Sequence, residues 1–237
     1  MPTTLDIIAV TFIAVAVPLY SLWERRKNKD LHPDSDPDLL PTSYWRTIIM
    51  LWAMVAMVLG IWVLEGRGFE TLGLTAAQTD FGIWVWLAVG LMATLLVFQS
   101  YKAGTDEKVA STLMASLENE EGVNDVMPRR ENEYRLFNWV SITAGITEEI
   151  LYRGFLIWFF AAWMPIWAAA AASIVVFTLA HLYQNSVTAL TKVAGMAVVL
   201  TAVYLVSGSL WPAILLHAVV DLTSNAMFWR ARNFAAA

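Results

Sequence analysis

The sequence contains no cysteine, and charged residues make up only 15% of its 237 residues. The absence of cysteine excludes disulfides, a thiolate zinc site, a cysteine nucleophile and lipidation of the chain itself. A soluble domain of this length carries about 25% charged residues. The low charge content therefore excludes an ordinary soluble globule, a disordered chain and a nucleic-acid-binding protein. The net charge of −5 comes mostly from acids in loops and says little about partners.

What the sequence has instead is apolar residues, which make up 58% of the chain, with 12 tryptophans among them. They gather in long runs that do not alternate with polar residues, which favours helices over strands. Each run is about long enough to cross a hydrocarbon layer of ~30 Å as a helix. The sequence therefore predicts an all-α, polytopic membrane helix bundle with about seven transmembrane helices. These span residues 5–23, 48–64, 81–98, 136–164, 166–182, 187–206 and 211–229.

The basic residues predict how the bundle is oriented. With seven spans and the N-terminus outside, the segments on the inner side are 24–47, 99–135, 183–186 and the tail 230–237. Twelve lysines and arginines fall in these segments, and the outer loops contain only Arg67. This is a strong positive-inside signal. We expect an integral protein of a bacterial inner membrane, with the N-terminus outside, the C-terminus in the cytosol and the first run kept as an anchor.

Ionisable residues are concentrated in the last four predicted spans. Each such group costs roughly 2.5–3.5 kcal/mol at the centre of a bilayer, so it is usually functional or paired. The first three spans have almost none beyond their ends. We therefore place the active site between the C-terminal four helices. The ionisable residues there are Glu148, Glu149, Arg153, His181, Lys192, His217 and Asp221.

The spacing of these residues indicates which of them pair. Glu149 and Arg153 are four residues apart and share a helix face, so they can form an ion pair. Glu148 lies about 100° round the helix, where its carboxylate can stay available as a general base. His217 and Asp221 are also four residues apart, and the aspartate can orient the imidazole.

Three motifs in order carry a resemblance to a known family. Residues 148–153 read EExxxR, residues 177–181 read FxxxH, and residues 217–221 read HxxxD. This pattern resembles the CPBP family of intramembrane proteases, which comprises the type II CAAX prenyl endopeptidases and their bacterial relatives. The resemblance divides the chain into N-terminal helices and loops (1–135), a protease core (136–229) and a short basic tail (230–237).

The resemblance implies a role for each residue of the motifs. Glu148 would be the general base that activates water, and His181 would assist it. Glu149 and Arg153 would organise the site. His217, together with the fourth residue of its motif, would stabilise the oxyanion.

The last of these positions departs from the commoner family pattern. Many members have asparagine there, and this chain has Asp221. An ionised aspartate cannot donate a hydrogen bond to an oxyanion. Asp221 is therefore expected to orient His217 or to stay protonated, and Asn225, one turn further on, could supply an amide.

The resemblance implies a membrane-associated peptide or protein as substrate, the lipid bilayer as surroundings, and no cofactor or nucleic acid. In an alternative zinc-dependent protease, Glu148, His181 and His217 would be the metal ligands. A non-catalytic immunity or regulatory factor on the same scaffold is a second alternative, and a proton-coupled transporter is a third. Because Glu148 lies ~18 Å along the helix from Leu136 and His181 lies near the inner surface, we expect a water-filled cavity that opens to the cytosol.

Overall fold

The structure is a computed structural model that describes residues 1–28, 36–76, 79–118 and 121–235. Within these residues all regular elements are helices, which confirms the predicted all-α bundle. They are α1 (Thr4–Thr11), η1 (Phe12–Ala16), α2 (Val17–Asn28), α3 (Leu39–Leu64), η2 (Phe69–Leu72), α4 (Gly82–Lys102), α5 (Glu107–Glu118), α6 (Glu121–Asn124), α7 (Glu131–Glu148), η3 (Glu149–Leu156), α8 (Ile157–Ala161), α9 (Ile166–Ala180), η4 (Leu182–Gln184), α10 (Val187–Ser207) and α11 (Leu210–Ala235).

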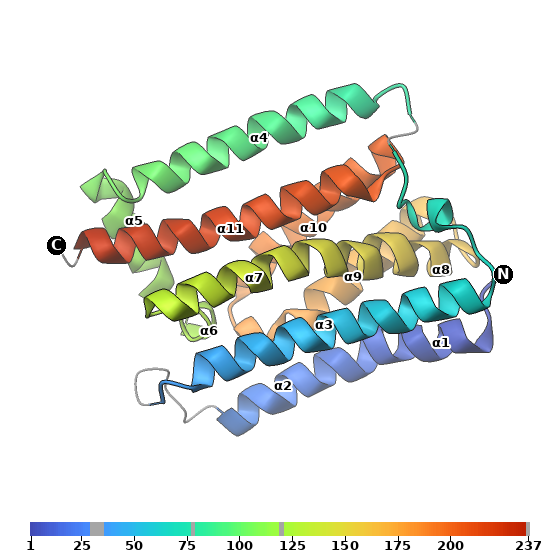
Figure 1. Ribbon diagram of the computed structural model, residues 1–237, viewed down its shortest axis with the longest axis horizontal. Coiled ribbons are helices and arrows are strands. Elements are labelled where there is room, and N and C mark those ends of the chain that lie inside the picture. Colours follow the sequence, from blue (N-terminus) through green and yellow to red (C-terminus); the bar gives the residue numbers. More distant parts are fainter. Residues whose placement is uncertain (29–35, 77–78, 119–120, 236–237) are drawn as a thin grey trace.

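Five helices among the described residues are long and apolar enough to cross a membrane. They are Thr4–Trp23, Leu39–Leu64, Gly82–Lys102, Ile166–Gln184 and Val187–Ser207. Of the two other predicted spans, 136–164 lies in α7–η3–α8 as far as Ala161, and 211–229 lies within α11. These segments carry most of the ionisable groups singled out from the sequence, which lower their hydropathy. Both run along the same axis as the apolar helices (Figure 1). The protein is an integral membrane protein with a polytopic bundle.

The helices form one bundle in which α11 and α7 are central. In Figure 1 the near layer runs α4, α11, α7, α3 and then α1–α2, with α9 and α10 behind it. The two ends of the chain lie at opposite ends of the bundle (Figure 1). The end that holds the C-terminus also holds α5 and α6.

Apolar side chains cover the outside of the bundle, and several polar ones lie inside it. Trp84, Leu91 and Trp167 are among the large exposed side chains. Glu149 and Arg153 are among the buried charged ones. This distribution is expected for a protein surrounded by lipid, because exposing apolar side chains to lipid tails carries no hydrophobic penalty.

One buried ion pair holds the first helix at the N-terminal end of the bundle. Asp6 is fully buried, and both of its carboxylate oxygens accept hydrogen bonds from Arg67, at 2.7 and 2.8 Å. The Arg67 guanidinium also lies 4.9 Å from the ring centre of Trp62 and 4.6 Å from that of Trp158. The hydrogen bonds to Asp6 raise the pKa of Arg67 above its ordinary value. The only basic residue of the predicted outer loops thus fastens α1 to α3 and α8.

Candidate active site

The EExxxR motif lies where the helix changes its hydrogen-bond pattern. The α-helix α7 ends at Glu148, and Glu149 begins the π-helical segment η3. A π-helix pairs residues five apart, and such segments frequently lie at functional sites. The hydroxyl of Ser173, on α9, donates a hydrogen bond of 2.6 Å to the carbonyl oxygen of Tyr152. This contact gives a carbonyl in η3 a partner from a neighbouring helix and fixes the backbone there.

Glu149 is the central acceptor of the site. Its Oε1 accepts from Arg153 Nη1 at 2.8 Å and lies 2.7 Å from Nδ1 of His217. The side chains of Glu149 and Arg153 are 0% and 1% exposed. The ion pair that the spacing predicted is therefore present, and it is enclosed in the bundle. A charge in such surroundings is tolerated only when it is paired and hydrogen-bonded.

Arg153 is held from two further sides. Its Nη2 donates to the carbonyl oxygen of Ala197, on α10, at 3.4 Å. Its guanidinium lies 4.4 Å from the ring centre of Phe177, on α9. Three helices thus fix the arginine that holds Glu149.

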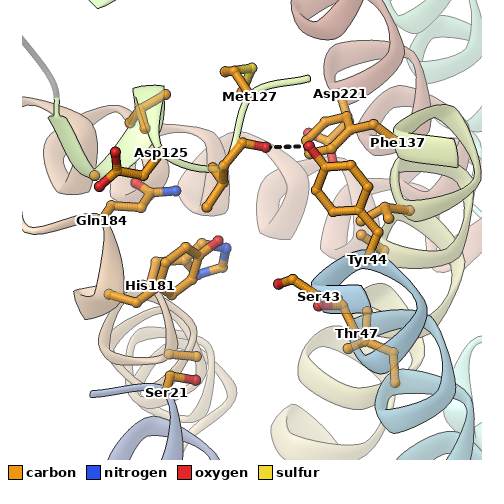
Figure 2. A pocket seen from close by; sticks show the side chains of 18 of the residues that line it. Ser21, Ser43, Tyr44, Thr47, Asp125, Met127, Phe137, His181, Gln184 and Asp221 are labelled. Carbon is orange, nitrogen blue, oxygen red and sulfur yellow. Dashed lines mark hydrogen bonds between the residues drawn. The ribbon is translucent and has the colours of Figure 1, made fainter. Parts of the chain in front are cut away.

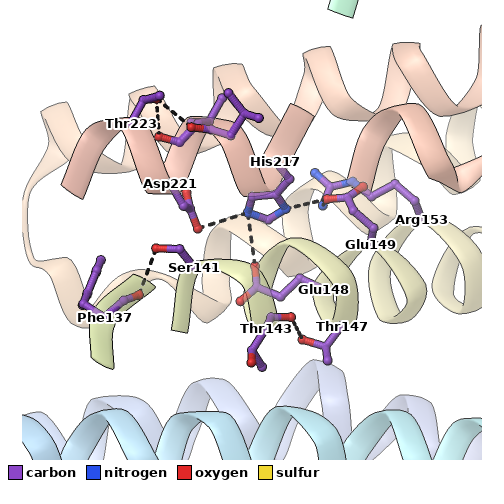
Figure 3. A network of polar contacts seen from close by, with 12 residues as sticks. Phe137, Ser141, Thr143, Thr147, Glu148, Glu149, Arg153, His217, Asp221 and Thr223 are labelled. Carbon is purple, nitrogen blue, oxygen red and sulfur yellow. Dashed lines mark hydrogen bonds and ion pairs between the residues drawn. The ribbon is translucent and has the colours of Figure 1, made fainter. Parts of the chain in front are cut away.

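The other nitrogen of His217 faces two carboxylates. Its Nε2 lies 3.9 Å from Oε2 of Glu148 and 3.7 Å from Oδ2 of Asp221 (Figure 3). These distances are longer than hydrogen bonds. Glu149, through Nδ1, is therefore the hydrogen-bond partner that orients the imidazole, the task that the spacing had given to Asp221. With Nδ1–H donating to Glu149, Nε2–H is available to donate only when the ring is doubly protonated.

His181 lies at the end of α9, beside Phe177. Its Nδ1 is 2.8 Å from the carbonyl oxygen of Phe177, and the two ring centres are 4.6 Å apart. A carbonyl only accepts hydrogen bonds, so Nδ1 carries a proton and the neutral ring has its lone pair on Nε2. The ring of Phe177 is also 6.2 Å from that of His217. Phe177 thus packs between the two histidines.

One cavity brings the predicted site residues together. Its volume is about 1080 Å³, and Glu148, His181, His217 and Asp221 line it. Figure 2 shows His181 and Asp221 on opposite sides of this space. Glu149 and Arg153 are not among the lining residues and lie behind His217. The six predicted residues therefore divide into four that line the cavity and two that support it.

The cavity reaches the end of the bundle that holds the C-terminus. Residues 36, 38–40 and 122–127 line it there, and they belong to segments predicted to lie in the cytosol. The hydroxyl of Tyr44 donates to the carbonyl oxygen of Val126 at 2.6 Å, so residues 122–127 are fastened across this end. A cavity is therefore present beside Glu148, and its opening to the cytosol stays a prediction; sequence patterns gave no sign of the segment that covers it.

The part of the chain that the structure describes contains no ready-made zinc site. Among the described residues, no three histidine, aspartate or glutamate side chains gather closely enough to hold a metal ion. The ligands of the zinc alternative were Glu148, His181 and His217. Glu148 Oε2 lies 3.9 Å from His217 Nε2, and the contact of His181 Nδ1 with a carbonyl oxygen leaves Nε2 as the free nitrogen of that ring. We derive no step through a metal.

The amide of Asn225, which its position suggested as a donor to the oxyanion, is hydrogen-bonded within the protein. Its Nδ2 donates to Oδ1 of Asn138 at 2.8 Å and to the carbonyl oxygen of Tyr134 at 3.4 Å. The amide thus joins α11 to α7, and it is already engaged. A residue that the sequence analysis left out is Tyr152, which lines the cavity four residues after Glu148. The i,i+4 rule that pairs Glu149 with Arg153 could also have found it.

Residues 131–223 match the family described as type II CAAX prenyl endopeptidase Rce1-like. The match runs from the start of α7 into α11 and contains all six predicted site residues. It confirms the resemblance over this segment of the chain. The family is one of endopeptidases, so the predicted class of enzyme, a hydrolase, is confirmed as well. No curated protein and no solved structure matches the chain.

Proposed function

We propose that the protein is an intramembrane endopeptidase in which Glu148 activates a water molecule to hydrolyse a peptide bond. The observation that supports this most directly is the difference between two adjacent glutamates. Glu149 is enclosed and bound by Arg153 and His217, whereas Glu148 is 15% exposed and lines the cavity. A general base must reach both the water and the substrate, and of the two glutamates only Glu148 meets that requirement.

The proposed reaction uses the groups that line the cavity. Glu148 takes a proton from water while the water oxygen attacks the scissile carbonyl carbon. The lone pair on Nε2 of His181 accepts a hydrogen bond from the second O–H of this water and thereby orients the water. The second proton stays on the water oxygen. The tetrahedral intermediate then collapses, the C–N bond breaks, and Glu148 returns its proton to the leaving amine.

The substrate is proposed to be a membrane-associated peptide or protein that reaches the site through the cavity. Apolar side chains of α2 and α3 line part of this space, among them Val17, Met50 and Met54. Hydroxyl groups of Ser43 and Thr47 lie on the α3 side of this space. An unwound peptide of a membrane protein could use both kinds of group. Its apolar side chains would contact the apolar residues, and its backbone would need hydrogen-bond partners such as these hydroxyls away from water. The family description makes a peptide with a prenylated cysteine near its C-terminus the first substrate to test.

The test compares the wild-type protein with Glu148→Gln and His181→Ala on an internally quenched peptide that ends in a farnesylated CAAX sequence. The same peptide without the farnesyl group is the matched substrate control. We expect Glu148→Gln to lower cleavage by about 10²–10⁴-fold while the protein is still inserted and folded. Unchanged cleavage by Glu148→Gln would contradict the proposal. Comparison of membrane proteomes of wild-type and Glu148→Ala cells, for a precursor that accumulates, identifies the natural substrate.

A further inference from the structure

The proposed reaction creates a negative charge on the carbonyl oxygen of the substrate. Most polar groups around Glu148 cannot donate a hydrogen bond to that oxygen. An oxyanion is stabilised by hydrogen-bond donors aimed at the position where the charge develops. The carboxylates of Glu148 and Asp221 are acceptors when ionised. The amide of Asn225 donates to Asn138 and Tyr134. The hydroxyl of Tyr44 donates to the carbonyl oxygen of Val126.

The hydroxyl of Tyr152 has the properties that such a donor needs. Tyr152 lines the same cavity as Glu148 and follows it by four residues in the chain. The residue is only 3% exposed. Among the described residues, no hydrogen bond of this hydroxyl is found. The oxygen is also not among the fully buried polar atoms that lack a partner, so part of its surface is accessible. The hydroxyl therefore reaches the cavity with its donor unused.

The surroundings of Tyr152 also hold it rigidly. Ser173 binds its carbonyl oxygen at 2.6 Å, and its ring packs edge-on against Phe177, with ring centres 5.0 Å apart and planes at 89°. The same Phe177 packs against Arg153 and both histidines of the site. A donor that is fixed before the reaction needs no reorganisation when the charge appears, and electrostatic stabilisation depends on this.

We propose that the Tyr152 hydroxyl donates a hydrogen bond to the oxyanion of the tetrahedral intermediate, which makes Tyr152 a catalytic residue. This inference rests on the proposed function. When the water oxygen bonds to the carbonyl carbon, one water proton goes to Glu148 and the C=O electron pair moves onto the carbonyl oxygen. Tyr152 O–H donates to that oxygen and keeps its proton. When the C–N bond breaks, the electron pair returns, and the proton on Glu148 goes to the amine.

The test is Tyr152→Phe, which removes the hydroxyl and keeps the ring that packs against Phe177. With the quenched farnesylated CAAX peptide, we expect kcat to fall roughly 10²-fold and KM to stay within twofold, because only the transition state carries the charge. Tyr204→Phe is the matched control, since Tyr204 is a partly buried tyrosine of α10 that does not line the cavity. It should keep both constants within twofold.

A second measurement separates catalysis from packing. A phosphinate analogue of the same peptide carries a tetrahedral anion at the scissile position. It should inhibit Tyr152→Phe more weakly than wild type, by about the factor lost in kcat. A kcat within twofold of wild type, or an unchanged inhibition constant, would overturn the role of Tyr152. If Glu148→Gln lowers cleavage by about 10²–10⁴-fold in the same assay, the proposed function survives that result; if Glu148→Gln cleaves normally, both proposals fail.

Discussion

Nδ1 of His217 lies 2.7 Å from Oε1 of Glu149, and the two residues are 68 positions apart in the chain. The same oxygen accepts from Arg153 at 2.8 Å. One buried carboxylate thus joins η3 to α11 and turns the other nitrogen of His217 toward the cavity. The motif EExxxR therefore supplies two carboxylates with separate tasks, one that builds the site and one that faces the substrate.

The two adjacent glutamates should respond differently to the same substitution. Glu149→Gln leaves Arg153 buried without a counter-charge, which we expect to lower the free energy of unfolding by about 3–5 kcal/mol. Glu148→Gln changes a group that lines the cavity, so its stability should stay near that of wild type while cleavage falls by about 10²–10⁴-fold. Thermal unfolding in detergent and peptide cleavage, measured on both variants, check this. Equal stability of the two variants would contradict the supporting role given to Glu149.

Gly145 should be essential for the approach of α7 to α11 beside the site. A Cβ atom there would lie 2.7 Å from the backbone nitrogen and 2.8 Å from the Cα of Ala218. Backbone atoms cannot move aside, so Gly145→Ala has to push the helices apart and stretch the contact between Glu149 and His217. We expect a loss of about 1–3 kcal/mol in stability, together with reduced cleavage.

The control for Gly145→Ala is Gly195→Ala, on α10. A Cβ atom at Gly195 meets nothing within 4 Å. Because alanine favours a helix over glycine by about 1 kcal/mol, this variant should be as stable as wild type or more so. A similar loss of stability in both variants would show that the close packing of Gly145 is not the cause.

The sequence predicts those parts of the fold that depend on composition and local spacing. The apolar runs predicted the helices because a backbone in lipid must pair within its own segment. The Glu149–Arg153 pair followed from a four-residue spacing that a neighbouring turn satisfies. The collection of charges in otherwise apolar helices marked the site, since such groups are costly unless they have a function.

The contacts between helices could not be predicted in the same way. No local pattern indicates that Glu149 meets His217, because the contact depends on how closely α7 packs against α11. The π-helical pattern from Glu149 onward is likewise accompanied by a partner from α9, the hydroxyl of Ser173. The four-residue spacing therefore predicted that Asp221 orients His217. In the structure, the packing of the helices places Glu149 in hydrogen-bond contact with His217 instead.

Asp221 should limit the rate because it places an acceptor where a donor is useful. Its Oδ2 lies 3.7 Å from Nε2 of His217 on the cavity wall, and its side chain is 34% exposed. Asp221→Asn supplies an amide donor at this place and removes one of three neighbouring carboxylates. We expect kcat for the farnesylated peptide to rise by about 10-fold, a fraction of what a well-aimed oxyanion donor contributes.

Asp221→Ala separates the two effects of that substitution. It removes the carboxylate and adds no donor, so its kcat should stay below that of Asp221→Asn. A fall in kcat for the asparagine variant, measured on correctly folded protein, would mean that the carboxylate itself takes part in the reaction or holds His217 in its active form.

The ion pair between Asp6 and Arg67 should be essential for holding the first helix to the bundle. Arg67→Ala leaves a fully buried carboxylate without its two hydrogen bonds and removes a cation from beside the rings of Trp62 and Trp158. Breaking a buried pair from one side costs about 3–5 kcal/mol. We expect a clear fall in the apparent Tm in detergent and faster proteolysis of the N-terminal segment.

Arg135→Ala is the matched control, because its ion pair with Glu131 is exposed on both sides and such pairs contribute about 0–1 kcal/mol. If the two variants unfolded at the same temperature, Asp6 would have to be satisfied by another group, and the first helix would be held by apolar packing alone.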